Sequence, residues 1–538
     1  MTDWNFADVW EVVADTIPHA PAAVHGERRV RWEDLERRAN AVARGLLDLG
    51  VARQDKVAHY LYNCTEYMES TFAIVKDGLV PVNTNYRYGD EELLYLWDNA
   101  DAVAVIFHGS FAERVERIRS GVPRVRAWLW VDDGSGPCPD WATPYEALAS
   151  EPAERARPPW GRSGDDLYLL YTGGTTGMPK GVMWRQDDLF CRLNAGNFLR
   201  VPEDGGVEGV RKTIVGAGPV HLPACPLMHG TGGFTAMGAM AVGGCVVTLT
   251  NRSFDPVELL DTIDGENVNT VAIVGDAFAK PILAALDEHP GRWKLSTLLA
   301  FISSGVMWSE ETKRALLGHH PNMMLVDAFS SSEALGLGTS VSSGENAAHT
   351  ARFSLNEDVR VVDPETGKDV TPGSGEVGML ALAGRNPLGY YKDPDKSAST
   401  FKVFDGVRYS VPGDFATVDT DGAIQLLGRG SVVINTGGEK VFPEEVEEVL
   451  KRHPAVRDAV AVGIPDDRFG QAVAAVVELR PDASVTDTEL IGHVRAQLSA
   501  FKAPKRVRFV DTIGRSPAGK VDYARHRSET TEWAAPPT

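Results

Sequence analysis

Apolar residues follow two different spacings along the first 350 residues of the chain. Residues 32–50, WEDLERRANAVARGLLDLG, place them at helical spacing and end at Gly50, which predicts an amphipathic helix. Short apolar runs such as KVAHYLY (56–62) and DAVAVIFH (101–108) alternate with such helices and predict buried strands. Because strands that alternate with helices form parallel sheets covered on both faces, the pattern predicts an α/β fold.

The pattern changes near Arg352. Short strand-like runs separated by Gly, Pro and Asp turns, among them VRVVD, GEVGMLALAG and GAIQLLG, predict a small antiparallel sheet or barrel over residues 350–428. Beyond residue 428 helical and strand-like runs alternate again, and the first of them is the helix PEEVEEVLKRH. The length of this last part suits a compact terminal domain. We therefore expect two domains, 1–428 and 429–538.

One uncharged stretch raises the question of a membrane span. Residues 213–251 contain no Asp, Glu, Lys or Arg, but they hold three prolines, two histidines and many glycines. A membrane helix needs about 20 predominantly apolar residues, so a buried glycine-rich helix followed by a central strand fits better, and we expect no integral membrane span. The N-terminus lacks the basic flank and apolar run of a signal peptide, and the five cysteines follow neither a disulfide nor a zinc spacing. We expect a cytoplasmic protein.

The charge balance narrows the class of partner. The chain has 54 Lys and Arg against 74 Asp and Glu, a formal net charge of −20. Broad binding of a nucleic-acid backbone needs a basic face, so we expect no nucleic-acid partner, whereas a nucleotide held by a few local donors remains compatible. A homodimer is one assembly that the sequence leaves open.

The strongest chemical signal is LYLLYTGGTTGMPKGVMW, residues 167–184. An apolar strand runs into a loop rich in glycine and threonine, with Lys180 near its end. Glycines let backbone N–H groups converge on one point, and the hydroxyls and the ammonium add donors, so the loop predicts a cradle for a polyphosphate.

Two other glycine-containing segments do not compete with this loop. GRSPAGKV (514–521) resembles a P-loop, but Val521 replaces the magnesium-binding hydroxyl. GSGEVG (373–378) spells a dinucleotide fingerprint, but it leads into a strand-like run instead of a helix, so we interpret it as a decoy.

The chain resembles the adenylate-forming superfamily, which comprises acyl-CoA synthetases, luciferases and adenylation domains. YTGGTTGMPKGV is similar to the family's signature phosphate loop, and further similar segments follow in the family's order across essentially the whole chain. These segments are PLMHGTG, DAFSSSEALG, GEVGMLALAGRNPLGYYKDPDKSASTF, YSVPGD, GRGSVVINTGGEKVFPEEVEEVL and SPAGK. The resemblance implies a large N-terminal domain of two doubly wound sheets plus a small β-barrel, and a smaller mobile α+β C-terminal domain.

The resemblance also implies a nucleotide site. The phosphates of ATP would be held by Thr172, Gly173, Gly174, Thr175, Thr176, Gly177 and Lys180. Adenine and the α-phosphate would be contacted by Gly305, Phe329, Ser330, Ser331 and Ser332. Asp414 and Arg429 would bind ribose, since a carboxylate can accept from both hydroxyls.

The resemblance assigns the chemistry to fewer residues. Glu333, with Thr172, would hold Mg²⁺, a cation that prefers oxygen ligands. Lys520 would neutralise charge as the carboxylate attacks the α-phosphate, and His229 would gate the acyl pocket, although a histidine on an apolar segment is often a core residue. The hinge would be Arg429, Gly430 and Ser431. Gly438 and Lys440 would touch AMP or pantetheine after the domain rotates.

The sequence departs from the family pattern in several places. Phe329 and Ser330 replace the usual Tyr-Gly, which keeps the aromatic ring but reduces backbone freedom. Gly305-Val306-Met307 replaces Gly-Ala-Pro on the adenine side, and Ser431 replaces the hinge acid. Residues 501–527 carry eight Lys or Arg against two acids, which would either face the phosphates of CoA or ATP or form a solvated basic face.

The resemblance implies an ATP- and Mg²⁺-dependent acid–CoA ligase with coenzyme A as co-substrate. The motifs most resemble actinobacterial acyl-CoA synthetases that act on fatty acids or steroid side-chain carboxylates. The uncharged, Gly- and Met-rich segment after His229 suggests room for an apolar body and gives no partner to a substrate amine. The alternatives are an aryl-acid CoA ligase, a luciferase-like oxygenase and a non-catalytic nucleotide sensor.

Overall fold

The computed structural model divides the chain into two compact units. The first unit contains residues 1–350 and 382–410, and the second contains residues 351–381 and 411–538. The residues that the structure describes are 3–172, 178–306, 308–344, 346–429, 432–436, 439–466, 470–498, 500–516, 519 and 521–534.

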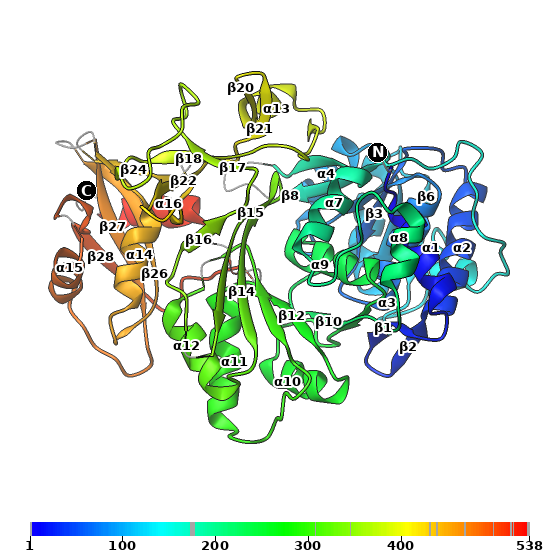
Figure 1. Cartoon of the computed structure of the whole chain (residues 1–538), viewed down its shortest axis with the longest axis horizontal. Helices are drawn as coiled ribbons and strands as arrows, with labels where there is room; N and C mark the ends of the chain where they lie inside the picture. The colour runs from blue at the N-terminus through cyan, green and yellow to red at the C-terminus, as the bar shows by residue number, and fades with distance from the viewer. Residues whose placement is uncertain are drawn as a thin grey trace. The chain divides into compact units, whose positions relative to one another are not determined.

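One sheet of the first unit has the strand order β2-β1-β11-β10-β12-β13-β14-β15 (Figure 1). Its strands are β1 (Pro21–His25), β2 (Arg28–Arg31), β10 (Val220–Pro223), β11 (Cys245–Thr248), β12 (Thr270–Ile273), β13 (Ala300–Ser303), β14 (Met324–Ser331) and β15 (Ala334–Ser343). Neighbours from β1 to β14 pair in parallel, whereas β2 and β15 pair antiparallel. The predicted parallel sheet is therefore confirmed.

The other sheet of the first unit has the order β19-β9-β8-β4-β3-β5-β6-β7. Its strands are β3 (Lys56–Tyr60), β4 (Val80–Asn83), β5 (Ala102–His108), β6 (Ala127–Val131), β7 (Thr143–Pro144), β8 (Leu167–Thr172), β9 (Lys180–Arg185) and β19 (Gly389–Tyr390). The sheet is parallel from β7 to β8, and β9 and β19 extend it with antiparallel pairs.

Helices connect these strands. They are α1 (Phe6–Thr16), α2 (Trp32–Asp48), α3 (Thr65–Lys76), α4 (Asp90–Asn99), α5 (Ala112–Ile118), α6 (Tyr145–Ala149), α7 (Gln186–Gly196), α8 (Gly206–Thr213), α9 (Gly230–Ala241), α10 (Pro256–Gly265), α11 (Asp276–Glu288), α12 (Glu310–His319) and α13 (Pro394–Thr400). The helix predicted at 32–50 is α2, and the strands predicted at 56–62 and 101–108 are β3 and β5.

The uncharged stretch 213–251 forms the predicted buried helix and central strand. They are α9 and β11, and β11 lies between β1 and β10 in the sheet. Within the described ranges, every helix falls short of the length or apolarity that a membrane crossing requires.

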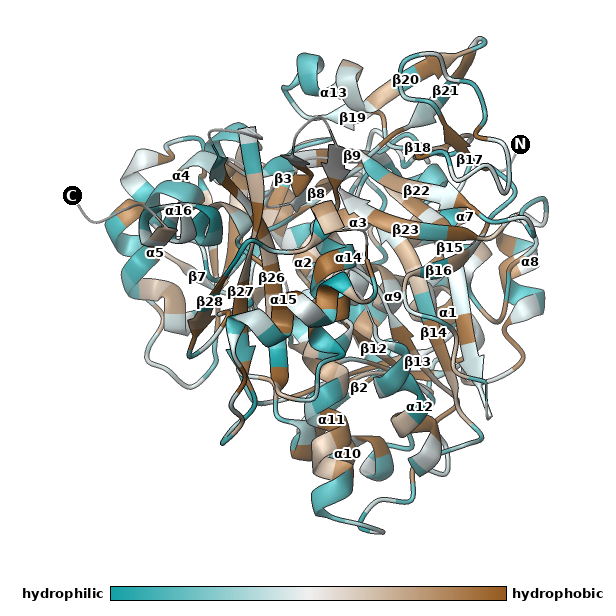
Figure 2. Ribbon diagram, turned by 90° about the vertical axis from the view of Figure 1, so that its left-hand side faces the viewer, coloured by the Kyte–Doolittle hydropathy of each residue, from teal (hydrophilic) through white to brown (hydrophobic). Residues whose placement is uncertain are grey.

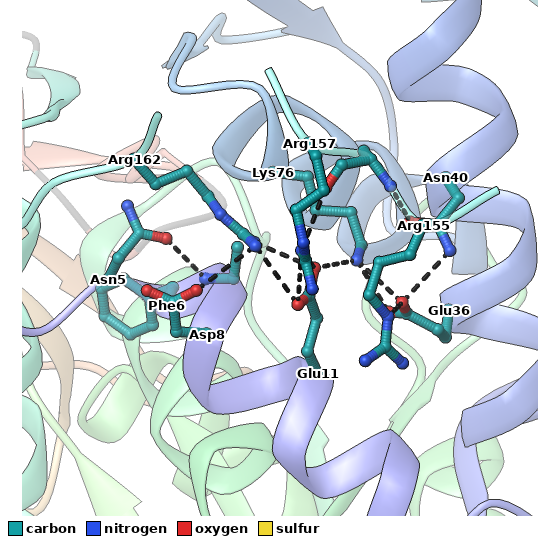
Figure 3. A network of polar contacts seen from close by, with 12 residues as sticks. Asn5, Phe6, Asp8, Glu11, Glu36, Asn40, Lys76, Arg155, Arg157 and Arg162 are labelled. Atoms are coloured by element: carbon teal, nitrogen blue, oxygen red, sulfur yellow. Dashed lines mark hydrogen bonds and ion pairs between the residues drawn. The ribbon is translucent and has the colours of Figure 1, made fainter. Parts of the chain in front are cut away.

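A buried charge network fastens residues 151–166, the connector between α6 and β8, to the first helices (Figure 3). Lys76 of α3 is 0% exposed, and its Nζ donates to Glu11 of α1 at 2.6 Å and to Glu36 of α2 at 2.9 Å. Arginines of the connector form ion pairs with both carboxylates: Arg155 with Glu36, and Arg157 and Arg162 with Glu11. Burial alone would raise the pKa of Glu11, but the hydrogen bond from Arg162 and the charge of Lys76 bring it to about 2.

The second unit contains a small antiparallel sheet and a five-stranded sheet. The strands of the antiparallel sheet are β16 (Arg352–Leu355), β17 (Val359–Val362), β18 (Gly378–Leu382), β22 (Asp414–Val418) and β23 (Ile424–Arg429). The five-stranded sheet contains β24 (Ile434–Thr436), β25 (Glu439–Val441), β26 (Val456–Asp466), β27 (Gly470–Leu479) and β28 (Arg506–Val510), with helices α14 (Pro443–Lys451), α15 (Asp487–Arg495) and α16 (Tyr523–Ala534). In Figure 2, β26 and β27 are mostly apolar, whereas α14 and α15 carry both polar and apolar residues.

Residues 382–410, within the range expected to be barrel-like, belong to the first unit. There β19 pairs with β9, β20 (Phe401–Phe404) pairs with β21 (Val407–Ser410), and β21 pairs with the end of β18. The boundary at residue 428 stays a prediction.

Candidate active site

The ends of the phosphate loop lie side by side. In the β8·β9 pair, Thr172 is the register partner of Lys180, so the loop starts and finishes at neighbouring positions. Gly173, Gly174, Thr175, Thr176 and Gly177 lie outside the described residues. Gly181, the residue after Lys180, packs closely against Tyr171 of β8: a Cβ on Gly181 would lie 2.7 Å from a ring carbon of this tyrosine. Only glycine fits this position without moving the tyrosine ring.

Asn83, at the end of β4, connects the phosphate loop to the segment that contains His229. Its Nδ2 donates to the carbonyls of Tyr171 at 2.8 Å and Met228 at 2.7 Å, and its Oδ1 accepts from the Tyr171 N–H at 2.6 Å. Asn83 is 4% exposed. The buried amide therefore fixes the last residues before the loop and the residue before His229 relative to each other.

Helix α9 begins directly after His229. The glycines of this helix serve close packing: a Cβ on Gly232 would lie 2.4 Å from the Pro226 carbonyl oxygen, and one on Gly233 would lie 2.6 Å from that of Leu227. The predicted room for an apolar body therefore does not come from these two glycines. A Cβ on Gly305, whose φ is +94°, would lie 3.9 Å from the Thr231 hydroxyl, which places this glycine beside the start of α9; its predicted contact with adenine stays a prediction. Met307 lies outside the described residues.

Glu333 stands at the tip of a tight hairpin. Ser331 and Ala334 are register partners in the β14·β15 pair, so Ser332 and Glu333 form the connection between the strands. Two bonds from elsewhere in the unit hold this backbone: Trp184 Nε1 donates to the Ser332 carbonyl at 3.0 Å, and Ser410 Oγ donates to the Glu333 carbonyl at 2.6 Å. The hairpin tip is thus anchored from β9 and from β21.

Three of the residues predicted to contact adenine, Phe329, Ser330 and Ser331, precede this tip on β14. The pairing shifts register between Phe329 and Ser331, and Ser330 Oγ accepts from the Gly336 N–H at 3.0 Å. Ser331 Oγ is buried and has no hydrogen-bond partner among the described residues. Such a hydroxyl is available to a bound ligand. Burial raises the pKa of Asp327, also on β14, to about 7, so this carboxyl is partly protonated at neutral pH.

The Glu333 carboxylate fits a magnesium ion. The residue is 9% exposed and its Oε1 accepts from the Tyr390 hydroxyl at 2.7 Å, a hydrogen bond that leaves the second oxygen available to a cation. Among the described residues no group of three or more His, Cys, Asp or Glu side chains surrounds a common point. A single carboxylate suffices, because Mg²⁺ commonly binds one or two carboxylates together with substrate phosphates. The part of Thr172 in metal binding stays a prediction.

The predicted ribose residues lie in the second unit. Asp414 begins β22, is 4% exposed and is the register partner of Arg429 in β23. The pairing brings the two predicted ribose contacts to neighbouring backbone positions. Gly430, Ser431, Gly438 and Lys520 lie outside the described residues, as do the side chains of Arg429 and Lys440, so their roles stay predictions.

The basic segment 501–527 forms ion pairs within the second unit. Lys502 contacts Glu445, Lys505 lies 2.9 Å from Asp466, and Arg515 lies 2.6 Å from Asp458. These acids come from β26 and α14, so part of the local charge is neutralised by partners distant in sequence, and the segment as a whole is less basic than its composition indicated.

Sequence reasoning missed several residues that shape the site. They are Asn83, Trp184, Tyr390 and Ser410, together with Asp393, whose Oδ2 lies 2.6 Å from Lys180 Nζ. Four of these stand in quoted motifs, which gave a signal without a role: Trp184 ends LYLLYTGGTTGMPKGVMW, Tyr390 and Asp393 lie in GYYKD, and Ser410 lies in YSVPGD. Asn83 lies outside every quoted motif, and its bonds to Tyr171 and Met228 join it to residues far away along the chain.

Two family descriptions match the chain. Residues 10–391 match the AMP-binding enzyme family, and residues 445–520 match the AMP-binding enzyme C-terminal domain. A medium/long-chain-fatty-acid–CoA/3-oxocholest-4-en-26-oate–CoA ligase from Mycolicibacterium smegmatis is 41% identical over 539 residues, which cover 98% of this chain and 97% of the relative. A 3-oxocholest-4-en-26-oate–CoA ligase from Rhodococcus rhodochrous is 41% identical over 540 residues, 98% of this chain and 96% of the relative.

Solved structures of similar fold accompany these relatives. ATP-bound MatB from Rhodopseudomonas palustris superposes with a TM-score of 0.81 at 25% identity, over 99% of this chain and all of that one. The anthranilate CoA ligase AuaEII, in complex with anthranoyl-AMP, has a TM-score of 0.82 at 22% identity over 100% of this chain and 99% of that one, and shows the fold alone. With both family descriptions matched in order and relatives aligned over nearly the full length, the chain belongs to the AMP-binding enzyme family.

Proposed function

We propose that this protein is a cytoplasmic, ATP- and Mg²⁺-dependent acid–CoA ligase that activates a fatty acid or a bulky apolar acid such as a steroid side-chain carboxylate. One structural observation carries the proposal: the strand that leaves the phosphate loop also anchors the Glu333 hairpin, through Trp184 and the Ser332 carbonyl. The cradle and the carboxylate are thereby held at one place. The relatives named for fatty-acid and steroid-acid ligation support the same reaction class.

The first half-reaction joins two anions. A carboxylate oxygen of the acid attacks the α-phosphorus of ATP, the bond to the bridging oxygen breaks, and pyrophosphate leaves with the electron pair of that bond. Mg²⁺, held by Glu333 and the ATP phosphates, would offset the negative charge there. The loop ending at Lys180 orients the leaving phosphates, and Lys520 donates to the oxygens at which charge develops, because positioning and cationic stabilisation are the main requirements of such transfers.

The second half-reaction transfers the acyl group. The CoA thiol loses its proton to solvent and attacks the acyl carbonyl, and AMP leaves. In this proposal the terminal domain turns about Arg429–Ser431 between the two steps and brings Gly438 and Lys440 to the site, so that one small domain serves both reactions. Asp414 holds ribose throughout.

The preference for an apolar acid rests on the uncharged helix that follows His229. Helix α9 contains no charged residue, and the half-buried side chains on its first two turns include the hydroxyls of Thr231 and Thr235. A substrate ammonium would find no carboxylate partner on this helix. An aryl acid is the alternative substrate class.

Acid-dependent exchange of pyrophosphate into ATP, followed by CoA-dependent release of AMP, tests the proposal. A panel of medium- and long-chain fatty acids, steroid side-chain acids and aromatic acids is expected to give thioester with members of the first two groups. Exchange without thioester would favour a luciferase-like oxygenase, thioester with aromatic acids alone would favour the aryl-acid ligase, and no exchange with any acid would favour a nucleotide sensor. Sedimentation of the full chain tests whether it is a homodimer.

A further inference from the structure

A short segment after residue 387 is pinned onto the strand that leaves the phosphate loop. In β19, Gly389 and Tyr390 pair antiparallel with Met183 and Val182 of β9. The pairing continues on both sides: Leu388 N–H donates to the Met183 carbonyl at 2.8 Å, and Tyr391 N–H donates to the Gly181 carbonyl at 2.8 Å. The register of this segment is therefore set by the phosphate-loop strand.

The register sends two neighbouring tyrosines to opposite partners, because successive side chains of a strand point to opposite faces. The Tyr390 hydroxyl donates to Glu333 Oε1 at 2.7 Å, whereas the Tyr391 hydroxyl donates to Asp101 Oδ2 at 2.8 Å. Tyr390 is 6% exposed. One tyrosine thus reaches the candidate metal carboxylate, and the other reaches an acid on the opposite side.

The end of the same segment holds the phosphate-loop lysine. Asp393 Oδ2 lies 2.6 Å from Lys180 Nζ, and the hydrogen bond from Lys180 lowers the pKa of Asp393 below its usual range. Lys180 Nζ also lies 5.9 Å from the centroid of the Tyr390 ring. Residues 388–393 therefore contact the cradle cation and the Glu333 carboxylate at once.

We propose that Tyr390 is a positioning residue for the metal-dependent half-reaction, on the basis of the proposed function and of Glu333 as its magnesium ligand. The hydroxyl holds one carboxylate oxygen, which fixes the plane of the carboxylate and directs the other oxygen to the cation. Mg²⁺ demands near-ideal octahedral geometry, so a carboxylate that rotates freely binds it less well. Groups that orient a metal ligand typically change metal affinity or activity about 10–100-fold when they are removed.

The chain provides a matched pair of variants. Tyr390→Phe removes the hydroxyl next to Glu333 and keeps the ring that packs against Phe401. Tyr391→Phe removes the same group from the adjacent residue, where its partner is Asp101. Both proteins are used as full-length chains, and thermal unfolding checks that they are folded.

Two readouts separate positioning from a structural role. Pyrophosphate exchange is measured against free Mg²⁺ at saturating ATP and acid, and binding of Mn²⁺ to the ATP complex is followed by electron paramagnetic resonance, independently of turnover. For Tyr390→Phe we expect the Mg²⁺ requirement to rise about 10–100-fold, Mn²⁺ affinity to fall in parallel, and the KM for the acid to stay within twofold, which is about the scatter of such assays. Tyr391→Phe is expected to match the wild type.

A double-mutant comparison makes the assignment specific to Glu333. Glu333→Gln keeps an acceptor for the Tyr390 hydroxyl but removes the charge, so adding Tyr390→Phe to it should change the metal dependence no further. Should Tyr390→Phe fail to fold, the Mn²⁺ affinity of Glu333→Gln still decides whether this carboxylate binds the metal, and wild-type affinity in it overturns the proposal. Unchanged metal dependence in a folded Tyr390→Phe overturns it too, with the ligase assignment intact. Absence of acid-dependent exchange in the wild type instead refutes the proposed function, and the Mn²⁺ measurement still reports on Tyr390.

Discussion

Replacement of Asn83 by alanine should separate the effect of the phosphate-loop anchor from the general cost of lost hydrogen bonds. The amide makes three bonds, to Tyr171 N, Tyr171 O and Met228 O, at 2.6–2.8 Å. Each contributes about 1 kcal/mol net, and a buried group left unpaired costs about 1–3 kcal/mol. Asn83→Ala should therefore lower the free energy of unfolding by about 3–5 kcal/mol, as measured by urea denaturation.

The functional effect follows from which groups are released. Tyr171 immediately precedes Thr172, so the loop loses its fixed starting point, and we expect the KM for ATP in pyrophosphate exchange to rise about tenfold, equivalent to about 1.4 kcal/mol. The KM for the acid should rise less, because Met228 is only one of the residues that position His229.

Asn63 provides the control. It makes two comparable bonds to the same segment, from Nδ2 to the Cys225 carbonyl at 3.1 Å and from Leu227 N–H to Oδ1 at 2.7 Å, but neither reaches β8. Asn63→Ala should cost about 2 kcal/mol and leave the KM for ATP unchanged. Equal effects of the two variants on ATP, or no effect of Asn83→Ala, would refute the reasoning.

Three further changes test other parts of the structure. Lys520→Ala should abolish pyrophosphate exchange while calorimetry still detects ATP binding, and wild-type exchange in this variant would contradict the assigned role. Lys76→Met leaves Glu11 and Glu36 without their buried lysine and should lower the free energy of unfolding by about 3 kcal/mol. This is the low end for a broken buried ion pair, because both carboxylates keep arginine partners. A loss under about 1 kcal/mol in urea denaturation would show that the arginines alone stabilise the two carboxylates. Burial lowers the pKa of His221 from 6.5 to about 4, so between these pH values the unfolded chain binds a proton that the folded chain does not. The free energy of unfolding is therefore unaffected by the titration of His221 above pH 6.5, and it decreases as the pH falls from 6.5 towards 4, by up to about 1.4 kcal/mol per pH unit. His221→Gln should flatten that part of the stability profile, and an identical profile would count against it.

Local periodicity predicted the elements that are long and strongly patterned. Helix α2 and strands β3 and β5 follow from apolar spacing, because the side chains that define the pattern are the ones that pack in the core. The phosphate loop is predicted from its glycines and threonines; its residues 173–177 lie outside the described residues, so this interpretation stays a prediction. The role of Glu333 is predicted from the resemblance alone, and the hairpin that carries it was not predicted.

Two features could not be predicted from the sequence: the ion pairs that neutralise part of the basic segment 501–527, and the close packing of α9. A count of charges along the sequence cannot show that Arg515 pairs with Asp458, since the two stand on different elements. A count of glycines likewise suggested space along α9, but Gly232 and Gly233 are there because the preceding backbone approaches too closely for a Cβ. Composition gives the residue types, but the fold determines which groups each side chain contacts.

The placement of residues 388–393 illustrates the larger reason. β9 belongs to one sheet of the first unit and the Glu333 hairpin to the other. No periodicity within either sheet specifies which strand of the first meets which turn of the second, because that depends on strand order and register. The two are joined by Trp184 from β9 and by Tyr390 from the strand paired with β9. A change in register of β19 by one residue would exchange the directions of Tyr390 and Tyr391, so the link between the strand after the predicted phosphate loop and the Glu333 carboxylate depends on this pairing rather than on the presence of the tyrosines.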